Sequence, residues 1–332
     1  MNQLYPLKFE PIYKPKIWGG DRLRKFLNKN NVPEKCGESW EISAVDGNVS
    51  VVSNGFLAGN NLQELIEIYM GDLVGDPVFE EFGDMFPLLI KFIDANHDLS
   101  VQVHPNDEMA YENHSSYGKT EMWYILEAEN GAKNITGLKA NTKQGDIVRH
   151  LAEKNLEEIL VTESAQKGDV FFIPAGRVHA TGKGILFAEI QQTSDITYRL
   201  YDYNRPDESG NLRELHIESA LEAIDYEIDT LSKVPYRSEI NTLNKLVDCQ
   251  YFTVHIFPIE GKVERILEHL NSFVVYMCVS GSCLIKHNVE KSPETLRKGE
   301  TILIPAIMHE LHIESMEENT ILLEVYINEK KK

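Results

Sequence analysis

The segment KGDVFFIPAGRVH at Lys167–His179 decides the fold, because KGETILIPAIMH at Lys298–His309 repeats its pattern. Each copy begins with Lys-Gly and an acidic residue, continues with an apolar run, and ends with Ile-Pro-Ala and a histidine. The glycine suits a tight turn, and the proline suits the end of a strand. A pattern that recurs at this separation predicts two related β-domains in tandem.

Short apolar stretches separated by Gly, Asn, Asp and Pro surround both copies, which favours a barrel or a sandwich. The predicted strands are Leu88–Ala95, Leu99–His104, Glu121–Leu126, Asp169–Pro174, Ile185–Gln191, Phe252–Phe257, Phe273–Val279, Thr301–Pro305 and Ile321–Ile327. Helical spacing occurs at Leu62–Tyr69, behind a cap at Asn60–Asn61, and at His216–Tyr226. A short helix is also expected from Glu108, capped by Asn106 or Asp107. We therefore expect a mainly β chain with a few helices near the N-terminus and between the barrels.

The composition limits the partners and the location of the protein. The 332 residues carry 33 Lys and Arg against 52 Asp and Glu, a formal net charge of −19. This field repels nucleic acid and anionic membranes, so we expect neither as a partner. No apolar run approaches the ~20 residues that cross a bilayer, and Met1–Pro15 lacks the apolar core of a secretory signal. The four cysteines show no CxxC spacing and predict buried, reduced thiols in a cytoplasmic protein: Cys36, Cys249, Cys278 and Cys283.

Metal-ligand residue types recur on the predicted strands. Gln102 and His104 share one face of their strand, because side chains alternate along it. Glu121 opens a very apolar strand, where a buried charge is costly unless a cation meets it, and His179 follows the Ile-Pro-Ala turn. These four residues offer the nitrogen and oxygen donors that zinc accepts, and a two-histidine, one-carboxylate set also suits non-haem iron. The alternative is that each histidine is an ordinary core or surface residue.

Two cationic residues accompany these candidates. Lys119 lies two residues before Glu121 and shares its face if the strand extends back. Arg199 ends the segment EIQQTSDITYR and could clamp a phosphate or an enediolate oxygen. The alternative for Arg199 is an exposed ion pair with Asp195 or Asp202.

The second copy of the repeat differs from the first. His309 is the counterpart of His179, but the region that we take to correspond, Phe273–Ile285, holds no Gln-x-His strand. We therefore expect a metal-binding catalytic domain over residues 1–240 and a degenerate domain without metal over residues 241–332.

Together, these motifs resemble the type I mannose-6-phosphate isomerases, in their short bacterial form, which are built on the cupin fold. The resemblance covers nearly the whole chain. The matching stretches are IWGG at Ile17–Gly20, LLIKFIDA at Leu88–Ala95, LSVQVHP at Leu99–Pro105, KTE at Lys119–Glu121, PAGRVHA at Pro174–Ala180 and Glu189–Arg199.

The resemblance implies two tandem cupin (jelly-roll) barrels and a zinc enzyme that interconverts mannose 6-phosphate and fructose 6-phosphate. It implies one Zn²⁺ per chain, with water as the alternative to Gln102, and a catalytic Arg199. Lys119 matches a lysine of the family's active site. Lys91 and Glu189 fall in matching motifs. The metal ligands that it implies are Gln102, His104, Glu121 and His179.

The implied reaction moves a proton between C2 and C1 of the open-chain sugar through an enediolate. The general base is Glu189, Lys119 or a hydroxide on the metal. Because ligating histidines must be neutral, zinc affinity is expected to fall below about pH 6. The alternative functions are a metal-dependent cupin that acts on an unphosphorylated sugar, a non-haem Fe(II) cupin oxygenase, and a non-catalytic sugar-phosphate-binding cupin.

Overall fold

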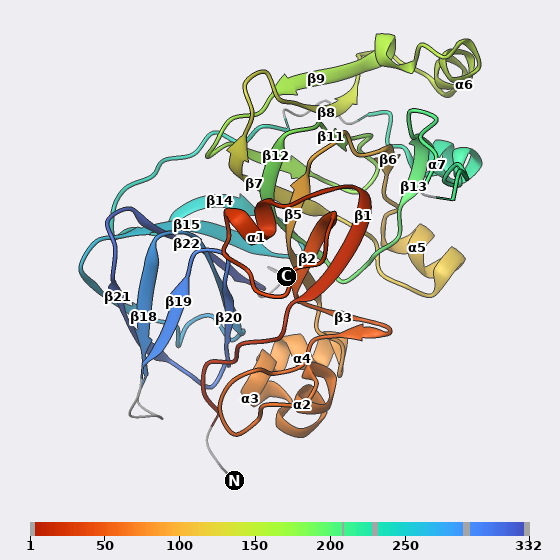
Figure 1. Cartoon of the computed structure of the whole chain (residues 1–332). Helices are drawn as coiled ribbons and strands as arrows, with labels where there is room; N and C mark the ends of the chain where they lie inside the picture. The colour runs from red at the N-terminus through yellow and green to blue at the C-terminus, as the bar shows by residue number, and fades with distance from the viewer. Residues whose placement is uncertain (1–3, 208, 228–231, 288–292, 329–332) are drawn as a thin grey trace.

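The computed structural model of the chain describes residues 4–207, 209–227, 232–287 and 293–328 (Figure 1). Most of its regular structure is β, and the strands fall into two groups that share no sheet among the described residues. All strand pairs are antiparallel in both groups, as the register of the long pairs β5–β12 and β15–β22 illustrates. The chain is therefore mainly β, as expected, whereas a domain boundary at residue 240 stays a prediction.

The first group builds a six-stranded sheet, in the order β1-β2-β5-β12-β7-β10, and smaller sheets in the orders β11-β8-β9 and β13-β6; β3 and β4 form a separate pair. Its strands are β1 (Ile12–Gly20), β2 (Cys36–Ile42), β3 (Ala44–Val45), β4 (Asn48–Val49), β5 (Leu88–Ala95), β6 (Val101–Val103), β7 (Glu121–Ala128), β8 (Lys133–Leu138), β9 (Leu160–Ser164), β10 (Val170–Ile173), β11 (Ala180–Thr181), β12 (Ile185–Gln192) and β13 (Tyr198–Tyr201).

The second group packs a five-stranded sheet, in the order β14-β15-β22-β17-β20, against a four-stranded sheet in the order β16-β21-β18-β19. Its strands are β14 (Asn244–Asp248), β15 (Thr253–Ile259), β16 (Lys262–Ile266), β17 (Val274–Ser280), β18 (Ser282–Lys286), β19 (Glu294–Arg297), β20 (Thr301–Ile304), β21 (Glu310–Ser315) and β22 (Thr320–Tyr326).

The two copies of the repeat occupy equivalent places in these sheets. β10 is the edge strand beside β7, with Phe171 opposite Trp123, and β20 is the edge strand beside β17, with Ile302 opposite Tyr276. In the first group β12 lies between β5 and β7, and in the second group β22 lies between β15 and β17. The sequence repeat therefore reflects a structural repeat.

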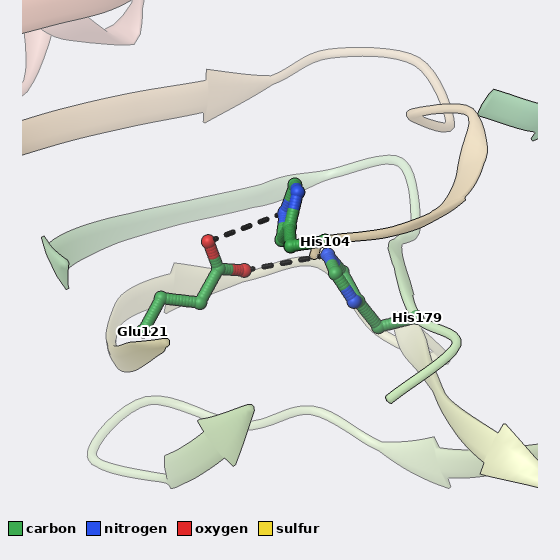
Figure 2. Close-up of side chains that lie close together, drawn as sticks. All are labelled: His104, Glu121 and His179. Carbon is green, nitrogen blue, oxygen red and sulfur yellow. Dashed lines mark ion pairs between the residues drawn. The ribbon is translucent and has the colours of Figure 1, made fainter. Parts of the chain in front are cut away.

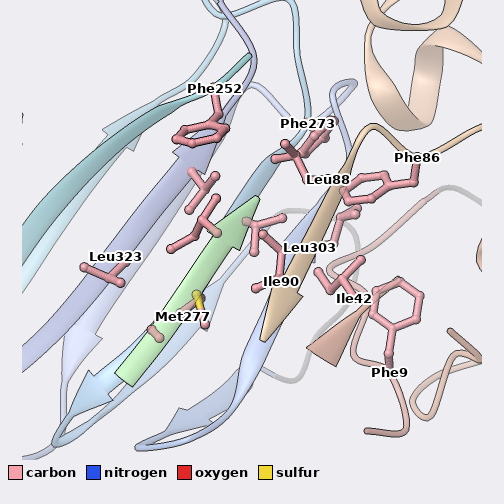
Figure 3. Close-up of a cluster of buried hydrophobic side chains, with 14 of the residues drawn as sticks. Phe9, Ile42, Phe86, Leu88, Ile90, Phe252, Phe273, Met277, Leu303 and Leu323 are labelled. Atoms are coloured by element: carbon pink, nitrogen blue, oxygen red, sulfur yellow. The ribbon is translucent and has the colours of Figure 1, made fainter. Parts of the chain in front are cut away.

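The six-stranded and five-stranded sheets face each other across the largest apolar core (Figure 3). Along β12, Leu186, Ala188 and Ile190 enter this core, whereas Ile185 and Phe187 face the interior of the first group. Both faces of the central strands are buried, which explains why β5 is a nearly continuous apolar run. The labelled members of this core are Phe9, Ile42, Phe86, Leu88, Ile90, Phe252, Phe273, Met277, Leu303 and Leu323.

The helices are short and lie mainly around the first group (Figure 1). Their bounds are α1 (Arg22–Lys25), α2 (Leu62–Tyr69), α3 (Gly71–Val74), α4 (Asp76–Phe82), α5 (Asp107–His114), α6 (Gln144–Glu153) and α7 (Ile217–Ala223), with a 3₁₀ turn at Leu156–Ile159. Asn61 caps α2 in a capping box and Asn106 caps α5, so both predicted caps are confirmed. Helix α6 is not among the helices expected from the sequence, and its only buried apolar residue is Ile147.

The four cysteines are free thiols, and only Cys249 among them is partly exposed. Among the residues that the structure describes, no helix is both long enough and apolar enough to cross a membrane.

Candidate metal centre

Three of the predicted metal ligands come together inside the first group of sheets (Figure 2). His104 follows β6, Glu121 opens β7 and His179 precedes β11. One ligand atom from each lies within 4.8 Å of the others, and each residue is at most 1% exposed. The backbone fixes two of these segments together, because the Gln102 amide donates to the His179 carbonyl at 3.0 Å and the His179 amide donates back at 2.9 Å.

Both histidines are held in the tautomer that a metal requires. His104 Nδ1 lies 2.9 Å from the carbonyl oxygen of Ile196, and His179 Nδ1 lies 2.8 Å from that of Arg177. Since a carbonyl oxygen only accepts, each Nδ1 carries the hydrogen and each Nε2 keeps its lone pair. This is how ligating histidines are oriented in metal sites.

Burial sets the electrostatics of this cluster. Burial, with the neighbouring Lys119 cation, holds the pKa of His104 well below its usual value, and burial lowers the pKa of His179 to about 3. Burial raises the pKa of Glu121 to about 7, although Lys119 acts in the opposite direction. Both imidazoles are therefore neutral near pH 7, and the carboxyl group is the part of the cluster that titrates there.

The surroundings of one Glu121 oxygen are evidence that this site binds a cation. Glu121 Oε1 is buried without a hydrogen-bond partner, and it lies 3.3 Å from the Nε2 atom of the neutral His179. A buried carboxylate oxygen that faces a lone pair is costly unless a positive charge is shared between them. Two imidazole nitrogens and a carboxylate oxygen are donors that fit a divalent metal ion.

Gln102 lies beside these ligands. Its amide nitrogen is 3.2 Å from His179 Nε2, and its Oε1 accepts a hydrogen bond from the Ser100 hydroxyl at 3.3 Å. The amide group therefore reaches the Nε2 atom that would bind the metal.

Lys119 is the cation that meets the buried Glu121. Its Nζ lies 2.6 Å from Glu121 Oε2 and 3.0 Å from His104 Nε2, and the residue is 5% exposed. The expected proximity of Lys119 and Glu121 is thus present in the structure.

Glu189 belongs to a second buried network next to the ligands. Its Oε1 accepts from Lys91 Nζ at 2.9 Å and its Oε2 accepts from Trp123 Nε1 at 2.9 Å, while Lys91 also donates to Gln191 at 2.6 Å. Burial favours the neutral acid, but the charges of Lys91 and Lys119 outweigh it and lower the pKa of Glu189. The Trp123 ring lies 5.6 Å from the His179 ring, which connects this network to the metal ligands.

Trp123 is the residue of this network that the sequence pattern did not reveal. Strand alternation could have found it, because Trp123 lies two residues beyond Glu121 and shares its face, just as Gln191 shares the face of Glu189.

Arg199 lies opposite Gln102 in the β6–β13 pair and is half-buried. Its side chain donates to the Ser100 hydroxyl at 3.3 Å and to the Glu214 carbonyl at 2.8 Å. The ion pairs of Asp202 are with Arg205 and Arg213. In the described part of the chain, therefore, Arg199 does not form the ion pair that we weighed as its alternative.

The second group of sheets corrects our placement of the Gln-x-His counterpart. The Leu267 amide donates to the His309 carbonyl at 2.7 Å, as Gln102 does to His179, so the counterpart is Leu267–His269 and not Phe273–Ile285. The error arises because the connection to the next strand is much shorter in the second copy. Val274 lies opposite Ile304 as Glu121 lies opposite Ile173, so an apolar residue occupies the place of the carboxylate.

Two protein-family models match different parts of this chain. The family model described as phosphomannose isomerase type I, catalytic domain, matches residues 6–143. The model described as mannose-6-phosphate isomerase, cupin domain, matches residues 242–323. The cupin match and the structural likeness below confirm the predicted mainly β cupin fold.

Two curated proteins are similar over most of their length. Mannose-6-phosphate isomerase ManA of Bacillus subtilis is 38% identical over 318 residues, which covers 94% of this chain and 97% of that protein. A mannose-6-phosphate isomerase of Streptococcus mutans is 36% identical over 306 residues, with 90% and 92% covered. The crystal structure of a mannose 6-phosphate isomerase from Bacillus subtilis matches with a TM-score of 0.86 at 34% identity, covering 98% of this chain and 100% of that one.

Proposed function

The chain belongs to the type I phosphomannose isomerase family, and from this premise we propose that it interconverts mannose 6-phosphate and fructose 6-phosphate with a bound zinc ion. The observation that carries the proposal is the buried set of His104, Glu121 and His179, with two oriented Nε2 atoms and a carboxylate oxygen that has no hydrogen-bond partner. The names of the relatives support the choice of substrate.

Zinc is the metal that suits these donors and this reaction. It accepts mixed imidazole and carboxylate ligands, and an isomerisation requires no redox change. We propose Gln102 as a fourth ligand, because rotation of its amide by about 180° exchanges the positions of its nitrogen and oxygen, with water as the alternative. When bound, zinc supplies a Lewis acid that stabilises negative charge on the sugar oxygens.

Arg199 supplies the second positive charge that an enediolate requires. Arg199 lies opposite Gln102 in the β6–β13 pair, and its guanidinium is held by the Ser100 hydroxyl and the Glu214 carbonyl. Charge-assisted hydrogen bonds from a fixed guanidinium stabilise an oxyanion without reorganisation during the reaction. We assign Arg199 to the sugar oxygens on this basis.

The contacts of Glu189 favour a positioning role over proton transfer. Both of its oxygens accept hydrogen bonds, from Lys91 and from Trp123, and its pKa is lowered. Lys119 lies closer to the ligands, with its Nζ in contact with both Glu121 and His104. We therefore propose that Lys119 Nζ, as the neutral amine, takes the proton from one carbon and, as the ammonium so formed, returns it to the other, a step typically worth about 10²–10⁴-fold in rate.

We propose residues 1–240 as the metal-binding catalytic domain and residues 241–332 as a degenerate cupin domain without metal. The presence of Val274 at the position equivalent to Glu121 supports this division of roles.

A coupled assay with mannose 6-phosphate, before and after chelation and zinc addition, tests the proposal. Activity that disappears with the chelator and returns with zinc is the expected result. A zinc-loaded protein that is inactive on mannose 6-phosphate but active on an unphosphorylated sugar would overturn the substrate assignment. Bound iron with oxygen consumption would instead identify an oxygenase.

A further inference from the structure

Asp107 connects the two chain segments that carry His104 and Glu121. It is the first residue of α5, three positions after His104. Its Oδ1 accepts from the Gly118 amide at 2.9 Å and from the Gln192 side-chain amide at 2.9 Å. Its Oδ2 accepts from the Tyr251 hydroxyl at 2.7 Å. One carboxylate therefore connects the start of α5, the approach to β7 and the second group of sheets.

The segment that follows Gly118 carries both Lys119 and Glu121, and hydrogen bonds to Pro105 and Gln192 hold its backbone in place. The Lys119 amide donates to the Pro105 carbonyl at 3.1 Å, and the Thr120 amide donates to Gln192 Oε1 at 2.8 Å. A Cβ atom at Gly118 would lie 2.6 Å from the backbone of Asn106 and Asp107, so the two segments approach more closely than a larger residue permits. The segment that leads to Glu121 is therefore anchored to Asp107 directly at Gly118 and, through Gln192, at Thr120.

Tyr251 reaches Asp107 from the second half of the chain. It lies in the turn between β14 and β15 and packs against the core that the two large sheets share. Burial and the hydrogen bond to Asp107 raise the pKa of its hydroxyl, which therefore stays a donor. The two partners of this hydrogen bond lie 144 residues apart in the sequence.

We propose that Tyr251 and Asp107 are positioning residues for the metal centre, through which the second cupin domain fixes the distance between Glu121 and His104. The inference rests on the proposed metal site and assigns the C-terminal half a direct role in its geometry. Neither side chain belongs to the cluster of His104, Glu121 and His179. Their effect is transmitted through the backbone at Gly118 and through Gln192.

Tyr251→Phe tests the proposal, because it removes one hydroxyl and keeps the aromatic packing. Tyr276→Phe is the matched control: the Tyr276 hydroxyl also donates to a carboxylate oxygen at 2.7 Å, that of Glu324, but inside the second group of sheets. We expect Tyr251→Phe to weaken zinc binding about fivefold and to lower kcat, since partners that orient metal ligands are typically worth about 10–100-fold. Tyr276→Phe should leave both quantities at the wild-type value, even where it lowers Tm.

Two variants of Asp107 separate positioning from folding. Asp107→Ala should weaken zinc binding by about tenfold or more, whereas Asp107→Asn should restore most of it, because an amide keeps an oxygen for Gly118 and a group for Tyr251. In the Asp107→Ala background, Tyr251→Phe should have no further effect on zinc affinity, because its partner is already absent.

The measurements are the zinc dissociation constant by competition with a chromophoric chelator, kcat and KM for mannose 6-phosphate, and Tm of the metal-free protein. Equal zinc affinity and kcat in Tyr251→Phe and the wild type would overturn the inference, and so would equal losses in Tyr251→Phe and Tyr276→Phe. A wild-type protein that neither binds zinc nor isomerises the sugar would instead refute the proposed function.

Discussion

Metal affinity should depend on pH through Glu121 and not through the histidines. The perturbation is a pH titration of zinc binding from about pH 8 to about pH 5. Protons and zinc compete for the same ligand atoms, so each ligand reduces the affinity once the pH falls below its pKa in the metal-free protein. Burial raises the pKa of Glu121 to about 7 and lowers that of His179 to about 3, and the pKa of His104 lies well below its usual value.

The pKa of Glu121 determines how strongly zinc affinity should change with pH. With a pKa of about 7 for Glu121, the ionised fraction is about 0.9 at pH 8, about 0.1 at pH 6 and about 0.01 at pH 5. Zinc affinity should therefore fall about tenfold by pH 6 and about 100-fold by pH 5, with a limiting slope of about one decade per pH unit. The expectation from sequence, a loss below about pH 6, assumed ordinary histidines, and the structure moves the onset upward and assigns it to the carboxyl group.

Isothermal titration with a competing chelator of known pH dependence measures this slope. Lys119→Met provides a directional test, because Lys119 lowers the pKa of Glu121 and its removal should move the steep region to higher pH. A slope near two decades per unit around pH 6 would mean that the histidines titrate, and would refute the reasoning. A constant affinity between about pH 5 and about pH 8 would refute it equally.

Three further predictions concern the site and its support. Arg199→Ala should lower kcat by about 10²–10³-fold while zinc content stays near one per chain, measured by steady-state kinetics and metal analysis; an equal loss of both would remove its proposed role. Glu38→Gln should destabilise the protein by about 3 kcal/mol at neutral pH, because burial is outweighed by Lys91 and Lys16 and the pKa of Glu38 is lowered to about 2. Since that stabilisation is present above the unfolded pKa and lost as the pH falls toward 2, the difference in unfolding free energy should vanish there, and a constant difference would contradict it. Chelation should lower Tm and zinc should restore it in proportion to the logarithm of its concentration, whereas a Tm independent of zinc would argue against a bound metal in the folded state.

Short sequence patterns were sufficient to predict the strands of this protein and part of its candidate site. The repeated Lys-Gly segments placed β10 and β20 correctly, and all nine predicted strands have a counterpart within a few residues. Alternation put Gln102 and His104 on one face, but it did not tell which face was interior, because Val101 and Val103 pack in an apolar cluster on one side while His104 is buried on the other. Contacts such as Tyr251 with Asp107 join residues far apart in sequence and carry no local signal. The helix α6 has too few buried apolar positions to stand out.

The two halves show what distinguishes a chemical site from its scaffold. Glu189 on β12 lies opposite Trp123, and Glu324 on β22 lies opposite Tyr276, so each half keeps a buried acid at the same register position. In the second half, Arg265 binds both oxygens of Glu324, at 2.8 and 2.7 Å, and completes a closed ion pair.

In the second half, Val274 occupies the position of Glu121. His269 and His309, the counterparts of His104 and His179, are exposed. Introducing a carboxylate at Val274 would therefore not be sufficient to create a second metal centre. At an exposed imidazole, protons and water compete with a metal for the nitrogen lone pair. Burial of His104 and His179 prevents this competition. The metal centre thus requires ligand identity and burial together, and the fold repeats the strand positions without repeating that burial.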